Sequence, residues 1–126
     1  DPDLIRWKTE LIKVAAKVLD KCKMIRYDER LGNLFPTDLG RIASHFYVQH
    51  QTIELFNEKM RPNMSDAEIF ALISQCSEFD NVTVRDDEME ELAKLESEYC
   101  QLDVKGGIEN KHGKISTYFA LLRLQR

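Results

Sequence analysis

The first twenty residues have the hydrophobic pattern of an amphipathic helix. Apolar side chains return at steps of three and four, and the acidic, proline-containing start Asp1-Pro2-Asp3 is typical of a helix N-terminus. The apolar row consists of Leu4, Trp7, Leu11, Val14, Ala15 and Val18, with Ile5, Ile12 and Leu19 beside it. A face this wide predicts a helix that packs on more than one neighbour.

The pattern then changes to that of a short β-hairpin. Residues 24–28 alternate between two faces, and residues 28–33 form a loop in which Gly32 can adopt a positive φ. Leu34 and Phe35 read as the second strand, which Pro36 ends. Because a two-stranded hairpin is marginal in water, we expect it to lean on the helices before and after it.

The chain after the hairpin is predicted to be helical. Thr37 is a good N-cap for a helix from about residue 38 to 60, unless this helix breaks near residues 49–52 and Thr52 caps a second segment. Small residues at Gly40 and Ala43 allow another backbone to approach closely. The buried face is predicted to hold Leu39, Ile42, Ala43 and Phe46, and further along Ile53, Phe56 and Met60.

Three more helices follow by the same reasoning. Ser65 and Glu68 form a capping box for a helix that buries Ile69, Leu72, Ile73 and Cys76. An extended connection at 79–84 leads to a helix at about 85–100 with an acidic outer face, where Arg85 and Glu88 are spaced for a local pair. This helix is predicted to bury Met89, Leu92, Leu95 and Tyr99. Gly106 and Gly107 read as a loop, and a last amphipathic segment runs from Lys114 to the end.

Composition and charge narrow the class of protein. The hydrophobic content of 43% and charged content of 32% are those of a globular domain, and no apolar run is long enough to span a membrane. Residues 1–62 carry 11 Lys and Arg against 9 Asp and Glu, whereas residues 63–126 carry 7 against 13. The second half is therefore poorly suited to bind phosphates. Three separated cysteines, Cys22, Cys76 and Cys100, indicate reduced thiols or small buried side chains.

No catalytic or metal-binding motif is found. His45 and His50 are five residues apart, which is a poor spacing for two ligands on one helix face, and His112 reads as an exposed loop residue. The basic residues of the first helix and the hairpin are candidates for nucleic-acid contact, or they form a solvated face. These candidates are Lys13, Lys17, Lys21, Arg26 and Arg30.

Several motifs occur in the order and spacing of a known family. Residues 18–28, followed by Thr37-Asp38-Leu39-Gly40-Arg41-Ile42-Ala43-Ser44-His45-Phe46-Tyr47-Val48, resemble the junction of the winged-helix and Sec-type helical domains in Ski-type superfamily-two helicases. Further matches are Thr52-Ile53-Glu54-Leu55-Phe56-Asn57, Ser77-Glu78-Phe79, Val84-Arg85 and Glu88. The resemblance covers about residues 1–115.

This resemblance implies a mainly α fold in two parts. Residues 1–40 would be the end of a winged helix, one helix plus its hairpin wing, and residues 41–126 the first helices of a Sec-type bundle. Gly40, Arg41, Phe79, Arg85 and Glu88 would be structural residues of the family motif. The ATP-binding motifs of the parent protein would precede Asp1, and the strand-contacting ratchet helix would follow Arg126.

The resemblance also implies a function. The chain would be a non-catalytic accessory segment of an ATP-dependent 3′-to-5′ helicase, with ATP and Mg²⁺ bound elsewhere in the parent and no cofactor in this segment. Its implied partners are the RecA-like motor domains of the parent, other subunits of the activating signal cointegrator complex, and single-stranded DNA or RNA through the parent, but no membrane. Location in nucleus and cytoplasm, with roles in DNA repair, transcription coactivation and ribosome quality control, would follow.

Two alternatives from other classes stay open at this point. One is a stand-alone winged helix that binds nucleic acid through the basic candidates. The other is a protein-interaction adaptor whose acidic helix at 85–100, with Glu90 and Glu91 on its outer face, docks a basic partner.

Overall fold

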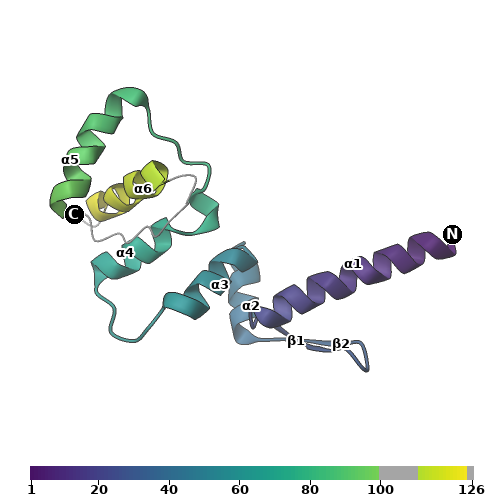
Figure 1. The fold of residues 1–126 in the computed structure, drawn as a ribbon. Coiled ribbons are helices and arrows are strands. Elements are labelled where there is room, and N and C mark those ends of the chain that lie inside the picture. Colours follow the sequence, from purple (N-terminus) through teal and green to yellow (C-terminus); the bar gives the residue numbers. More distant parts are fainter. Residues whose placement is uncertain (100–110, 125–126) are drawn as a thin grey trace. The chain divides into compact units, whose positions relative to one another are not determined.

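The computed structural model describes residues 1–99 and 111–124, with backbone only for 96–99. Within this part the chain forms two compact units, Asp1–Asn57 and Glu58–Arg126. The described elements are six α-helices and one two-stranded antiparallel sheet, so the predicted mainly α fold class is confirmed (Figure 1). The predicted loop at Gly106 and Gly107, and Cys100, lie outside the described residues.

The first unit contains a long helix, a hairpin and two short helices. Its elements are α1 (Pro2–Lys21), β1 (Ile25–Asp28), β2 (Asn33–Pro36), α2 (Asp38–His45) and α3 (His50–Lys59), whose last residues extend into the second unit. The second unit continues with α4 (Asp66–Ser74), two 3-10 helices, η1 (Ser77–Phe79) and η2 (Asp86–Glu88), then α5 (Met89–Tyr99) and α6 (Lys111–Leu124).

The predicted hairpin is present and leans on its neighbours. Its register pairs Arg26 with Phe35, and Gly32 has a φ of +72° in the connecting loop. The carboxylate of Asp20 in α1 accepts a hydrogen bond from the Tyr27 N–H of β1 at 3.2 Å. The hairpin is thus attached to the helix before it, as expected from the instability of an isolated pair of strands.

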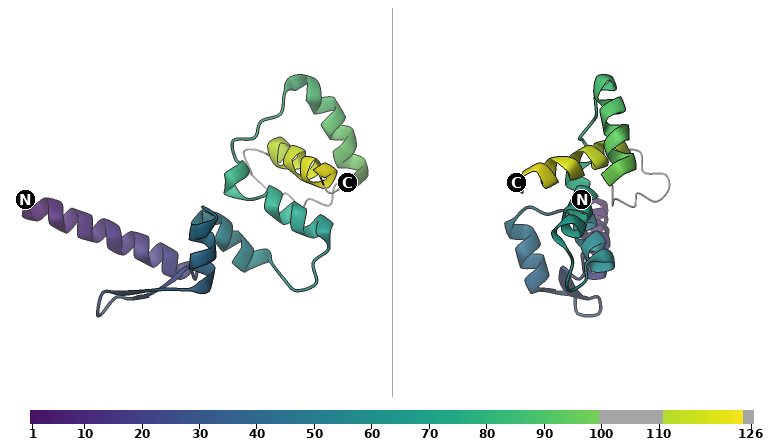
Figure 2. Two further views of the ribbon diagram at one scale, coloured as in Figure 1. Left: turned by 180° about the vertical axis from the view of Figure 1, so that it is seen from behind. Right: turned by 90° about the vertical axis from the view of Figure 1, so that its left-hand side faces the viewer.

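The prediction that α1 packs on several neighbours is wrong within the described residues. Only Ala16 of this helix is buried, and the apolar row is exposed, including Trp7 at 61% and Leu11 at 56%. Figure 2 shows the reason, because α1 meets α2 only at its C-terminal end and its first turns extend away from them. We call the exposed row Leu4, Trp7, Leu11, Val14 and Val18 the α1 stripe.

The corner between α1 and β1 is held by residues far along the chain. The Thr37 hydroxyl lies 2.7 Å from the Lys23 carbonyl and 2.8 Å from the Met24 carbonyl, and it accepts the Gly40 N–H at 3.0 Å. Asn57 in α3 donates its side-chain amide to the Cys22 carbonyl at 2.7 Å. Thr37 therefore caps α2, as predicted, and also ties that cap to the corner.

The core of the first unit forms around this corner. Buried Cys22, Ala43 and Ile53 are surrounded by partly buried Met24, Leu39, Val48 and Phe56. Ile42 and Phe46, predicted to be on the buried face, are exposed, and so is Met60. The reason is that the core contacts one narrow side of α2, the side of Leu39 and Ala43.

Of the two predictions for residues 38–60, one long helix or a break near residues 49–52, the second is correct. The helix ends at His45, Tyr47 takes a φ of +56°, and α3 begins at His50. The predicted cap at Thr52 is wrong, because Thr52 lies inside α3 and is buried, while the Gln49 carbonyl accepts the first N–H groups of this helix.

The second unit is built around α6, which contacts both α4 and α5 (Figure 1). Ile115 and Tyr118 of α6 and Leu72 of α4 are buried, and the Ser65–Glu68 capping box predicted for α4 is present. Leu92 of α5 is buried as predicted, with Met89 and Leu95 half-buried. Tyr99 lies where only the backbone is described.

Two boundaries in the second unit differ from the prediction. Phe79 lies in η1, so the extended connection covers only residues 82–85. Helix α6 begins at Lys111, which places His112 on an exposed helical position instead of in a loop. Both differences are local, since the hydrophobic pattern fixes the interior of an element better than its ends.

We predict that Gly40→Ala destabilises the first unit by about 3 kcal/mol, because the backbone must move to admit a methyl group. A Cβ at this position would lie 1.9 Å from the Met24 carbonyl oxygen, a backbone atom of the corner between α1 and β1. Thermal denaturation followed by circular dichroism measures the loss. Ser44→Ala, at an exposed site on the same helix, is the control, and equal stability of the two variants would contradict the prediction.

The capping box predicts a pH dependence. The hydrogen bond from the Ser65 N–H, with further help from the Ser65 hydroxyl and Arg61, holds the pKa of Glu68 below its usual value. A lowered pKa in the folded state contributes stability above the ordinary Glu pKa of about 4.3, and this contribution is lost as the pH falls through the lowered value.

The wild type should therefore have a higher free energy of unfolding than Glu68→Gln at about pH 6, and this difference should fall close to zero at about pH 2. Denaturation midpoints across this range measure it. Exposed Glu58→Gln serves as the control. A difference for Glu68→Gln that stays constant with pH would show that the carboxylate charge has no part in the cap.

Candidate functional site

The lysines predicted to contact nucleic acid are already paired with carboxylates of the same unit. Lys13 lies 3.3 Å from Glu10, Lys17 lies 3.0 Å from Glu29 in the hairpin loop, and Lys21 lies 3.9 Å from Glu54 in α3. The hydrogen bond and charge of Glu29 raise the pKa of Lys17. All three pairs are exposed, so each is weak, but a phosphate would have to displace the carboxylate.

The two candidate arginines lie on the hairpin and are exposed. Arg26 is on β1, and Arg30 is in the loop, where its N–H donates to the Asp28 carboxylate at 3.0 Å. The hollow beside Arg26 is also lined by Asp28, Glu29 and Asp38. Three carboxylates that line the same hollow as Arg26 make it less favourable for an anion. Nucleic-acid contact by the five basic candidates stays a prediction.

The motif residues of the first unit have structural positions. Gly40 gives α2 its close approach to the Met24 carbonyl, and Arg41 pairs with Asp38 one helical turn earlier at 3.2 Å. The predicted close approach at Gly40 is thus confirmed. Cys22, buried in the same core, is a free thiol whose pKa is raised by burial, which makes it unreactive.

The motif residues of the second unit lie in and before its 3-10 helices. Phe79 is half-buried in η1. Arg85 and Glu88 do interact, but through the Arg85 main-chain N–H, which donates to the Glu88 carboxylate at 3.3 Å. This is a cap of η2, not the charge pair expected from the i,i+3 spacing.

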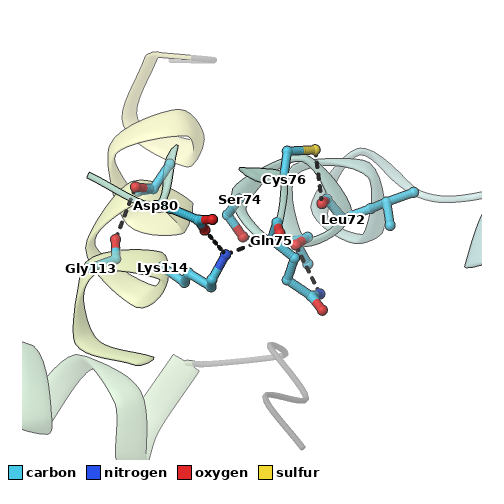
Figure 3. A network of polar contacts seen from close by, with 9 residues as sticks. Leu72, Ser74, Gln75, Cys76, Asp80, Gly113 and Lys114 are labelled. Carbon is cyan, nitrogen blue, oxygen red and sulfur yellow. Dashed lines mark hydrogen bonds and ion pairs between the residues drawn. The ribbon is translucent and has the colours of Figure 1, made fainter. Parts of the chain in front are cut away.

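A buried lysine organises the second unit, and sequence reasoning missed it. The Lys114 ammonium donates to the Gln75 carbonyl at 3.0 Å and to the Asp80 carboxylate at 2.9 Å (Figure 3). The side chain of Lys114 is 6% exposed, whereas that of Asp80 is 57% exposed. Because Gln75 is the C-cap of α4, the ammonium also lies at the negative end of this helix dipole.

The sequence shows that Lys114 lies among apolar residues, but it does not show whether the side chain is buried. Lys114 occupies a position among buried residues of α6, next to Ile115 and one turn before Tyr118. A lysine in an apolar helical stretch is usually placed at the surface, where its long stem lets the ammonium reach water. Only its position relative to the end of α4 shows that it has a partner.

Neither a metal site nor a membrane-spanning helix is found in the part of the chain that the structure describes. No group of three His, Cys, Asp or Glu side chains there is arranged to hold a metal ion. The described helices are all too short or too polar to cross a bilayer. Large apolar side chains are exposed on the α1 stripe, on the hairpin at Leu31, Leu34 and Phe35, and at the end of α2, where they are Ile42, Phe46 and Tyr47.

Residues 36–123 match the Sec63 Brl domain family. The chain belongs to this family. The match begins at the last residue of β2 and ends near the end of α6, so it includes Gly40, the end of α2 and the Lys114 contacts. The division into domains at residues 40 and 41 stays a prediction.

Relatives of this Sec63-type chain include proteins named as helicases. The ATP-dependent RNA helicase DExH14 of Arabidopsis thaliana is 46% identical over 96% of the chain. Human activating signal cointegrator 1 complex subunit 3 is 45% identical and the human U5 small nuclear ribonucleoprotein 200 kDa helicase 41% identical, each over 92% of the chain. The chain spans only 5–6% of the length of these relatives.

We predict that Lys114→Met destabilises the second unit of this Sec63-type chain by about 2 kcal/mol, because the Gln75 carbonyl and the end of α4 lose a charged donor. Chemical denaturation monitored by circular dichroism measures the change. Arg123→Met, on the exposed part of the same helix, is the matched control. Equal denaturation midpoints for both variants would contradict a role for the buried ammonium.

Proposed function

We propose that the chain is a non-catalytic accessory segment of an ATP-dependent 3′-to-5′ nucleic-acid helicase. It braces the motor of the parent protein and begins the helical domain that caps the nucleic-acid channel. The observation that carries this proposal is the match of more than 90% of the chain to a short segment of proteins named as helicases.

The surface of the first unit supports a bracing role. The α1 stripe exposes five large apolar side chains along a helix of 20 residues, and a helix of this length extends about 30 Å. A continuous exposed apolar row of this kind marks an interaction surface. We assign it to the motor domains of the parent, which the sequence resemblance implies as the partner.

The wider role belongs to the same proposal. ATP and Mg²⁺ would bind the motor of the parent, and single-stranded DNA or RNA would pass through its channel. Membership of an activating signal cointegrator complex, action in DNA repair, transcription coactivation and ribosome quality control, and location in nucleus and cytoplasm are proposed from the resemblance alone.

The two other function classes receive less support from the described residues. A stand-alone nucleic-acid-binding winged helix needs free cations, but Lys13, Lys17 and Lys21 each have a carboxylate partner. For an adaptor, α5 does expose Glu90 and Glu91 in its first turn. Carboxylates at a helix N-terminus are already accounted for by the helix dipole.

We predict that the α1 stripe docks on the motor, so that Leu11→Ser weakens binding of the chain to the motor portion of the DExH14 helicase at least about tenfold. Since Leu11 is 56% exposed, the same change should alter the stability of the isolated chain by less than about 0.5 kcal/mol. Isothermal titration calorimetry measures the binding and thermal denaturation the stability.

The single tryptophan gives a direct second measurement. Trp7 lies in the stripe, so a chain labelled with 5-fluorotryptophan has one ¹⁹F NMR signal, which should shift when the motor portion is added. Leu31→Ser, at an exposed apolar site in the hairpin loop, is the control. No binding by the wild type, or ATP hydrolysis by the chain alone, would contradict the proposed function.

A further inference from the structure

Helix α1 exposes a second row of side chains beside the α1 stripe. Each residue of this row directly follows one of the stripe in the sequence, so the two rows lie about 100° apart around the helix. Ile5 and Ile12 of this row are 66% and 63% exposed. We call it the second row, and it consists of Ile5, Lys8, Ile12, Ala15 and Leu19.

The first unit covers mainly the remaining side of α1. There the Asp20 carboxylate accepts the Tyr27 N–H of β1. Lys17 pairs with Glu29 of the hairpin loop on the same side. The stripe and the second row together take up about 180° of the helix circumference. Apart from half-buried Leu19, every residue of the two rows is exposed.

The spacing within each row is that of a contact between two helices. Both rows advance by three and four residues in turn, which is the repeat of the seam along which one helix packs on another. A helix that packs on one surface needs an apolar face only about 100° wide. Burial of both rows therefore requires a concave site in which two helices each cover one row.

A second copy of the chain fits these rows poorly. It would bring one further α1, which covers one row and leaves the other exposed. The stripe runs only from Leu4 to Val18, about two heptads, whereas a coiled coil needs about three or more. The helicase relatives are long proteins of which the chain spans 5–6%, so a parent of this kind offers many other helices.

One charge specifies the site further. Lys8 lies in the second row, is exposed, and makes no ion pair within the described residues. An ammonium that another protein covers without a partner loses its hydration at a large cost in free energy. The helix over the second row should therefore carry a carboxylate opposite Lys8, with apolar residues on either side of it.

We propose that α1 inserts between two helices of the motor portion of the parent helicase, one over the α1 stripe and one, with a carboxylate, over the second row. This inference rests on the proposed function and names the kind of site that holds the stripe. It also accounts for the exposure of α1 in the first unit, because the neighbours that its wide apolar face predicts come from the partner.

Substitutions in the second row test the inference, with calorimetry on the full chain and the motor portion of the DExH14 helicase. Ile12→Ser should lower the affinity at least about tenfold, while the melting temperature changes by less than about 2 °C because Ile12 is exposed in the free chain. Lys8→Glu should also lower the affinity at least about tenfold, because it places two carboxylates against each other. Arg6→Gln, on the exposed side opposite both rows, is the control and should bind as the wild type does.

Other results overturn the inference in distinguishable ways. If Ile12→Ser or Lys8→Glu binds as the wild type does while Leu11→Ser loses binding, docking uses one row only and the proposed function still stands. If the chain alone dimerises in analytical ultracentrifugation and Ile12→Ser abolishes the dimer, a second copy covers the row. If the wild type binds vesicles of phosphatidylcholine and phosphatidylserine and Ile12→Ser does not, the row contacts a membrane. If the wild type does not bind the motor portion, both proposals fail together.

Discussion

The first unit depends on the carbonyl groups at the corner between α1 and β1. A chain that turns from a helix into a strand leaves main-chain oxygens without helical partners, and these must be satisfied for the turn to be stable. Here the hydroxyl of Thr37 and the amide of Asn57 are the donors, and the missing side chain of Gly40 leaves room for the Met24 carbonyl. One small region thus fixes the relative positions of α1, the hairpin, α2 and α3.

In the second unit, too, a donor from a distant residue satisfies a carbonyl group at a helix end, but this donor is charged. The end of α4 also leaves carbonyl oxygens exposed, and the donor comes from a lysine 39 residues later in the chain. An ammonium is well suited to this place, because it satisfies the Gln75 carbonyl, opposes the helix dipole and keeps Asp80 as a counter-ion at the surface. In both units, contacts distant in sequence close a helix end that local structure leaves open.

This difference between local and distant contacts explains what the sequence could predict. The hairpin, the Thr37 cap and the Ser65–Glu68 capping box follow from residues within a few positions of one another, and all three are present. Periodicity could not decide which side of a helix meets the core. It therefore placed Ile42 and Phe46 inside and α1 among several neighbours, whereas the described core contacts α2 on the side of Leu39 and Ala43 and α1 at its end. The partners of Lys114 could not be predicted for the same reason, and Lys17 and Lys21 looked free because their carboxylates lie on other elements.

The distribution of satisfied and unsatisfied groups distinguishes the surfaces that have function from those that hold the fold. Among the described residues every buried side-chain nitrogen and oxygen has a hydrogen-bond partner, and Lys13, Lys17 and Lys21 of α1 each have a carboxylate within 4 Å. The buried polar groups of the described part are thus satisfied within the fold. The large exposed side chains that remain without partners in their own unit are apolar, and they include those of α1, of the hairpin and of the end of α2. A domain with satisfied polar groups and open apolar faces is suited to being held against another protein surface. This is what the proposed bracing role requires.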